Sequence, residues 1–147
     1  MRKFLLSTAA IVTCAVLATG CTSTDARAPA AGDQRAAMAP PGGNYQKVSD
    51  LVALPAFLPG LGTLYVQPAT LPAGPFLAYD RDGRLVSTIY MIPLADIEAQ
   101  KQFDGLAVGA ENVVDVDMYY NAGHPGVEKP HYHVVLWHVA KDDADLE

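Results

Sequence analysis

Three runs of nine residues, rich in β-branched and aromatic side chains, most constrain the fold of this chain. They are RLVSTIYMI at 84–92, NVVDVDMYY at 112–120 and HYHVVLWHV at 131–139. Such residues favour extended backbone, and a period of two places successive side chains on opposite faces of a sheet. The sequence therefore predicts a domain built mainly from β-strands.

Turn signals divide the rest of the domain into shorter strands. GTLYVQ at 62–67 alternates as a half-buried strand does, and residues 76–79 precede the tetrapeptide Asp80-Arg81-Asp82-Gly83. An Asp-Gly pair between two apolar runs is a strong hairpin signal. About five strands with tight turns predict a compact, mainly antiparallel β fold of the α+β class, either an open barrel or a sandwich.

Helical signals are few. Residues 94–104 form the best candidate for one short helix, and Gly105 is placed to end it in the left-handed conformation. A single helical turn is also expected at 49–54, with Ser49 as its cap and Pro55 after it.

The run at 112–120 predicts a strand with two unlike faces. Val114, Val116, Met118 and Tyr120 lie on one face, and Asp115, Asp117 and Tyr119 on the other. The two carboxylates favour the solvent face of a half-buried strand, although an acid–base pair or an ion site stays open. The aromatic side chains favour wall and core positions over a stacking platform. They are Tyr119, Tyr120, Tyr132 and Trp137.

All four histidines of the chain fall between positions 124 and 138. His131 and His133 project from the same face of one strand, and His124 lies in the preceding loop, where neighbouring glycines allow it to fold back. Three imidazoles are a common site for Zn²⁺ or another transition metal, and Glu128 could complete the ligand set or act on bound water. His138 points to the opposite face. A structural polar network and a metal-free binding or catalytic role remain as alternatives.

The first 21 residues, MRKFLLSTAAIVTCAVLATGC, predict export. Two basic residues precede an apolar run that is too short to span a membrane as a mature helix. The segment resembles a bacterial lipoprotein signal, with cleavage after Gly20 and acylation of Cys21, for example by palmitate. Thr22 follows the cysteine, where the absence of aspartate favours the outer membrane of a two-membrane cell, facing the periplasm. The alternative is an ordinary secretory signal followed by a chance cysteine.

The mature chain would then have neither a free thiol nor an internal disulfide, because Cys14 is removed with the signal. The mature chain keeps 8 basic and 16 acidic residues, which gives a formal charge of −8. This negative charge argues against nucleic-acid partners and against electrostatic binding to anionic lipids, so the acyl chains are the expected membrane contact. Residues 22–43, rich in Ala, Pro and Gly, predict a disordered tether, and residues 44–147 one β-rich domain.

Three segments carry a family resemblance. They are LPGLGTLY at 58–65, GPFLAYDRDG at 74–83 continuing to YMIP at 90–93, and GHPG at 123–126 followed by PHY at 130–132. Together they resemble a small bacterial family of often exported proteins that includes a Thermus protein controlled by an envelope-stress (sigma-E) factor. The resemblance implies a mainly β fold and self-association into a homo-oligomer, and it implies no particular activity.

The resemblance also bears on the histidines. The last strand of that family has the pattern His-aromatic-Asp-x-His. His131 keeps the first position here, whereas His133 stands at the acidic position and Val135 at the final histidine. A site that followed the family pattern would therefore differ here in two of its positions.

Three functions remain open from the sequence. The first is a lipid-anchored cell-envelope protein that binds a metal or small ligand through His124, His131 and His133. The second is a metal-dependent enzyme, hydrolase-like or cupin-like, in which Glu128 or Asp117 acts as base. The third is a structural, oligomer-forming lipoprotein with subunit contacts in the loop at 121–130. The sequence contains no glycine-rich phosphate loop, Gly-x-Ser-x-Gly elbow or His-Glu-x-x-His motif.

Overall fold

The computed structural model describes residues 36–110 and 112–147. The predicted signal and Cys21 lie outside these residues, as does most of the predicted tether. The last residues of that tether are part of the folded domain. Ala36 is buried, its carbonyl accepts a hydrogen bond from the Tyr79 hydroxyl at 2.7 Å, and the amide of Ala39 donates to the carbonyl of Gly83 at 2.8 Å. The folded part therefore extends at least to Ala36.

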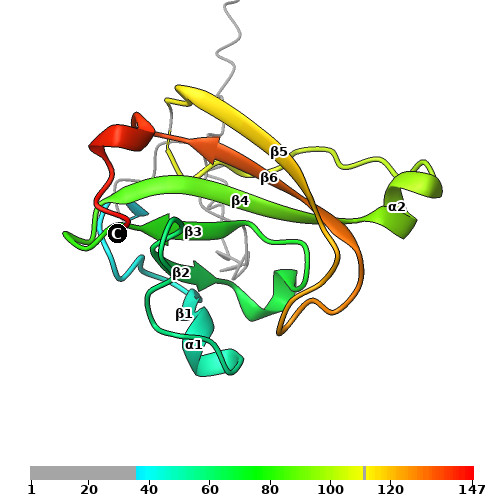
Figure 1. Ribbon diagram of the computed structural model, residues 1–147, viewed down its shortest axis with the longest axis horizontal. Helices are drawn as coiled ribbons and strands as arrows, with labels where there is room; N and C mark the ends of the chain where they lie inside the picture. Colours follow the sequence, from blue (N-terminus) through cyan, green and yellow to red (C-terminus); the bar gives the residue numbers. More distant parts are fainter. Residues whose placement is uncertain (1–35, 111) are drawn as a thin grey trace, which may run out of the picture.

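The domain is built on one curved, antiparallel sheet of six strands in the order β1-β2-β3-β4-β6-β5 (Figure 1). Two short α-helices, α1 (Val48–Leu51) and α2 (Leu94–Glu98), follow β1 and β4. The described residues also include the single 3₁₀ turns η2 (Pro68–Thr70) and η3 (Lys141–Asp143). The strands are β1 (Gln46–Lys47), β2 (Thr63–Val66), β3 (Phe76–Tyr79), β4 (Leu85–Pro93), β5 (Asp115–Asn121) and β6 (His131–Trp137).

The structure confirms the predicted mainly β, antiparallel fold. Its strands belong to one open sheet, so the described residues do not form a two-sheet sandwich. The sheet has six strands instead of about five, because the two-residue β1 is too short to show a period in the sequence.

The β3–β4 hairpin forms where the Asp-Gly signal predicts it. Asp80 closes the turn, with its carboxylate accepting from the backbone amide of Arg84 at 2.8 Å and from the Arg84 guanidinium at 3.1 Å. Gly83 adopts the left-handed conformation, with φ of 77°. These bonds satisfy a buried carboxylate and fix the register of the two central strands.

The helix predicted at 94–104 is wrong in length. Helix α2 ends at Glu98, and Gln100, with φ of 56°, takes the left-handed position after the helix that was expected at Gly105. Ile97 is 40% exposed, so the thin apolar stripe has little core to contact. A segment with so little apolar contact does not stabilise further helical turns. Helix α1 likewise begins at Val48, so Ser49 lies inside it and does not cap it.

Both faces of the central strands are covered. The inner, concave face carries the larger core, in which Val66, Ile89 and Val135 are almost completely buried and α1 closes one end. On the outer face, the segment that follows α2 crosses β4. The Tyr90 hydroxyl donates to the carbonyl of Ala107, and the Gly109 amide donates to the Thr88 hydroxyl at 2.9 Å.

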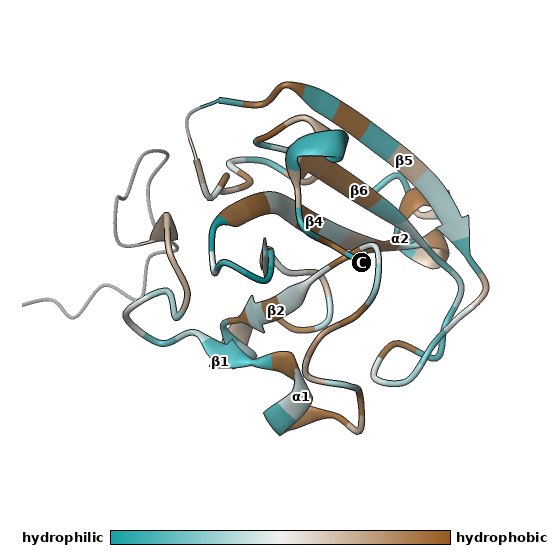
Figure 2. Cartoon of the chain, turned by 60° about the vertical axis from the view of Figure 1, so that its left-hand side comes forward, coloured by the Kyte–Doolittle hydropathy of each residue, from teal (hydrophilic) through white to brown (hydrophobic). Residues whose placement is uncertain are grey.

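The alternation along 112–120 separates the two residue classes onto opposite faces, as predicted, but the carboxylates lie on the inner face and not on the outer one. Strand β5 is an edge strand within the described sheet, and its register with β6 places Asp117 and Tyr119 on the inner face, opposite Val135 and His133. The apolar residues lie on the outer face and are 52–60% exposed: Val114, Val116, Met118 and Tyr120. The alternation of the two residue classes is visible along β5 in Figure 2.

Lys141 explains why the acidic side chains can lie on the inner face. Its ammonium group lies 3.0 Å from a carboxylate oxygen of Asp115 and 2.7 Å from one of Asp117, which also accepts from the Trp137 indole at 2.9 Å. These bonds, with that of Lys141 first, lower the pKa of Asp117. The carboxylates thus connect β5 to the end of the chain, a structural role that their spacing in the sequence does not predict.

Among residues 36–110 and 112–147, none of the helices has the length and apolar character needed to cross a bilayer.

Candidate metal centre

Strand β6 presents two histidines to the inner face of the sheet. His131 and His133 alternate with half-buried residues and are themselves buried, at 0% and 4% exposure. In the sheet, His133 pairs with Met91 of β4 and Tyr119 of β5. A period of two on a central strand therefore places both imidazoles side by side under the β5–β6 connection.

His124 reaches the same place from that connection. Its amide donates to the carbonyl of Val127 at 3.0 Å, and the amide of Val127 donates back to the carbonyl of His124 at 2.9 Å. Asn121 holds the start of the turn, because its side-chain oxygen accepts from the amide of Gly123 at 2.8 Å. The turn folds the chain back, as the glycines around His124 predict, and places its ring against those of His131 and His133.

Gly123 is required for this turn. Its φ is 133°, and a Cβ atom there would lie 2.4 Å from the carbonyl oxygen of Glu128. Gly123→Ala is therefore expected to displace His124 and weaken metal binding by about 10- to 100-fold, the usual cost of misplacing a ligand's support. The control is Gly43→Ala, at a glycine with φ of 73° and no atom within 4 Å of the added Cβ. Equal metal affinity in both variants, measured by competition with a chromophoric chelator, would contradict this role for Gly123.

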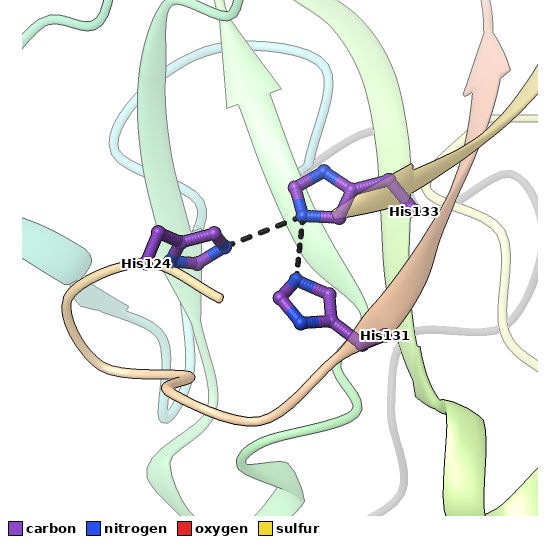
Figure 3. A group of neighbouring side chains, drawn as sticks. All are labelled: His124, His131 and His133. Atoms are coloured by element: carbon purple, nitrogen blue, oxygen red, sulfur yellow. Dashed lines mark hydrogen bonds between the residues drawn. The ribbon is translucent and has the colours of Figure 1, made fainter. Parts of the chain in front are cut away.

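The three Nε2 atoms converge on one another (Figure 3). The Nε2 atom of His133 lies 2.9 Å from that of His131 and 3.3 Å from that of His124. One ring nitrogen from each residue lies within 4.8 Å of the other two. Three nitrogens bound tetrahedrally to zinc at about 2.0–2.1 Å lie about 3.3 Å apart. The two distances from His133 Nε2 are close to that spacing, so the cluster has the dimensions of a site for such an ion.

The opposite ring nitrogens show why the Nε2 atoms carry lone pairs. His131 Nδ1 lies 2.7 Å from the carbonyl oxygen of Lys129, and His124 Nδ1 lies 3.0 Å from that of Pro125. A carbonyl only accepts, so each Nδ1 must donate, and in the neutral rings each Nε2 is left unprotonated. Two lone pairs therefore point at His133, an arrangement that favours a cation between the three rings.

Tyr119 completes the set of orienting bonds. Its hydroxyl lies 3.1 Å from Nδ1 of His133 and can either donate or accept. As acceptor, it leaves His133 Nε2 free as a third ligand. As donor, it places the proton on Nε2, where two neighbouring lone pairs compete for it. All three rings thus have the partner on the second nitrogen that metal-binding histidines almost always have.

Burial keeps His133 neutral. Desolvation, followed by the neighbouring His131 and His124, lowers the pKa of His133 from 6.5 to about 4. A histidine must be unprotonated to bind a metal, so this environment maintains the ligand form well below neutral pH.

The candidate ligand Glu128 and the fourth histidine both lie apart from the three rings. Glu128 is exposed and does not belong to the group of nearby ligand atoms. His138 lies on the other face of β6, as its position in the strand predicts. Its Nδ1 donates to the carbonyl of Asn112 at 2.7 Å, and its Nε2 lies 2.8 Å from the Thr88 hydroxyl. His138 is thus a structural histidine.

The sequence does not identify Tyr119 as part of the site. Its aromatic character predicts a wall or core position, and its hydroxyl instead orients His133. Only the register of β5 against β6 brings the two together, and the sequence alone does not give that register. The ring of Tyr119 also lies against His133, with 5.0 Å between the ring centres.

An apolar cavity of about 320 Å³ lies beside the histidines, between the inner face of the sheet and the segment from α1 to Leu61. His124 and His133 line it, and His131 does not. Gly126 contributes to its wall, close to the side chain of Val52. Two of the three rings, those of His124 and His133, therefore lie at the edge of a space that a small molecule can enter.

Neither a family model nor a curated protein matches the sequence. Among solved structures, the chain is similar to a hypothetical protein, TTHB210, from Thermus thermophilus. The two share 45% sequence identity with a TM-score of 0.55, over 60% of this chain and 87% of the Thermus chain. At this identity over most of the Thermus protein, the chain belongs to the same family as that protein.

Proposed function

We propose that this protein is a lipid-anchored component of the cell envelope that binds a transition metal through His124, His131 and His133. The observation that carries the proposal is the convergence of the three Nε2 atoms. The Nδ1 atom of each ring already has its own hydrogen-bond partner, namely the carbonyl oxygen of Lys129 or Pro125 or the hydroxyl of Tyr119. Imidazole ligands suit zinc, copper, nickel and iron, and three of them with an open position fit zinc well.

Elemental analysis of the full chain, purified without a histidine tag, tests the proposal. Near-stoichiometric metal is expected, either as purified or after reconstitution with Zn²⁺. A metal at about 100 times its Kd should raise the free energy of unfolding by about 2.7 kcal/mol. The proposal would be contradicted if the thermal unfolding temperature of the chelator-treated protein did not change on addition of Zn²⁺, Cu²⁺, Ni²⁺ or Mn²⁺.

The lipid anchor rests on the sequence of residues 1–21 and on the small residues before Cys21. Cys21→Ala should move the protein from the membrane pellet to the soluble fraction, because the predicted acyl chains are its main contact with the bilayer. The measurement is fractionation of cells that express the full chain, with palmitate labelling in parallel. Cys14→Ala is the matched control, since Cys14 lies within the predicted signal. A Cys21→Ala protein that stays in the pellet would argue against the anchor.

A metal-dependent enzyme is the second candidate, favoured by the cavity that His124 and His133 line. The predicted bases do not support it. Glu128 lies outside the histidine group, and the carboxylate of Asp117 is engaged with Lys141 and Trp137. The geometry therefore favours binding at the metal over hydrolysis.

Self-association is part of the same proposal. The outer face of β5 exposes contiguous apolar side chains, among them Val116 and Met118, on an edge strand of the described sheet. Such a face is typical of an interaction surface. Sedimentation of the full chain in the presence and absence of chelator would show whether an oligomer forms and whether it depends on metal.

A further inference from the structure

The cavity beside the histidines has polar groups at one end only. Its eighteen lining residues include four with side-chain polar groups, Tyr119, Asn121, His124 and His133. The others are aliphatic residues, phenylalanine, methionine, proline and glycine from α1, β2, β3, β4 and the intervening loops. Within the described chain, no lysine, arginine, aspartate or glutamate lines this space. An occupant with several charges would therefore bury them without partners, at a high cost in free energy.

The polar end is suited to one anionic group. Three neutral imidazoles leave the two positive charges of a divalent metal uncompensated, because the group of ligand atoms contains no carboxylate. Asn121 lines the same end, and its side-chain oxygen is engaged by Gly123, which leaves its NH₂ group to donate toward a ligand. A bound carboxylate would offset the charge of the metal and accept this hydrogen bond.

The volume limits the rest of the occupant. At about 320 Å³ the cavity is at the small end of the range for ligand pockets, about 300–1,000 Å³. Its rim reaches solvent at Leu71, which is 43% exposed. The apolar walls favour a hydrocarbon body, and each buried methylene strengthens binding about fourfold.

We propose that the cavity binds a small monocarboxylate with an aliphatic body, its carboxylate on the metal and its chain against the walls from α1 to β4. This inference rests on the proposed metal site. It assigns Asn121 to the head group and Leu51 of α1 to the chain.

The test is calorimetric titration of the zinc-reconstituted full chain with straight-chain carboxylates from acetate to decanoate. The affinity should rise about fourfold per methylene until the cavity is full and then level off. Leu51→Trp fills the cavity and should abolish the dependence on chain length while zinc remains stoichiometric. Asp50→Trp, at an exposed position of the same helix, should behave as the parent does. Leu71→Trp, at the exposed rim, gives a second blocked variant should Leu51→Trp fail to fold.

The outcomes separate the two proposals. The carboxylate ligand would be overturned, and the metal centre left in place, if the protein binds stoichiometric zinc but its carboxylate affinity does not depend on chain length. The same conclusion would follow if both blocked variants bind the carboxylates as the parent does. Equal octanoate affinity with and without zinc would overturn the role of the carboxylate at the metal. A protein that takes up no zinc would overturn both.

Discussion

His133→Ala should lower the affinity for zinc by at least about 100-fold. Loss of a group that only orients a ligand already costs about 10- to 100-fold, and His133 is the ring whose Nε2 lies closest to both other Nε2 atoms. The variant leaves two imidazoles and a space open to water, which is too weak a site to retain zinc against a chelator. Competition titration with a chromophoric chelator measures the change.

The matched control is His138→Gln. His138 directly follows β6, and its ring faces the opposite side of the sheet. His138 bonds to Asn112 and Thr88, and glutamine can keep a polar contact there. Its zinc affinity should equal that of the parent. Equal losses in the two variants would mean that the effect comes from general destabilisation and not from a ligand.

The metal-free protein should lose about 3 kcal/mol of its free energy of unfolding between pH 6.5 and about pH 4 through His133 alone. The pKa of His133 is lowered in the folded state, so in this interval the unfolded chain binds the additional proton. The contribution is therefore fully present above pH 6.5 and lost as the pH falls through the folded pKa. Bound zinc should deepen this loss, because protons compete with the metal for the same nitrogens.

Urea unfolding of the chelator-treated protein over this pH range measures the effect. His133→Gln cannot titrate, so its unfolding free energy should depend less on pH than that of the parent, by the amount assigned to His133. Parallel pH profiles for the two proteins would show that burial of His133 does not govern acid stability.

The sequence predicts the strands better than their faces. Runs of β-branched residues and the Asp-Gly turn give β4, β6 and the β3–β4 hairpin, because these signals are local. Local sequence signals do not determine which face of β5 is turned inward. Its apolar side would be expected in the core, but the pairing with β6 directs that side outward, and Lys141 and Trp137 satisfy the inward carboxylates. The helix predicted at 94–104 forms only as far as Glu98 for a similar reason, since the half-exposed Ile97 has little core to pack against.

The histidine group follows from the sequence in part. Alternation along a strand places His131 beside His133, and the glycines around His124 predict a turn that folds back. The role of Tyr119 depends on the register of β5, and the cavity depends on how α1 and the 51–61 segment close over the sheet. Glu128 has the right chemistry at a suitable spacing, yet the turn that brings in His124 leaves Glu128 exposed.

Anomalous diffraction at the zinc edge, from crystals of the protein grown with Zn²⁺, would locate the bound metal itself. The proposed metal centre predicts one anomalous peak at about 2.0–2.1 Å from Nε2 of each of His124, His131 and His133. It also predicts that the Nδ1 bonds to Pro125 and Lys129 persist. Electron density that shows the three rings hydrogen-bonded to one another, with zinc elsewhere or absent, would contradict a metal centre and make the cluster structural.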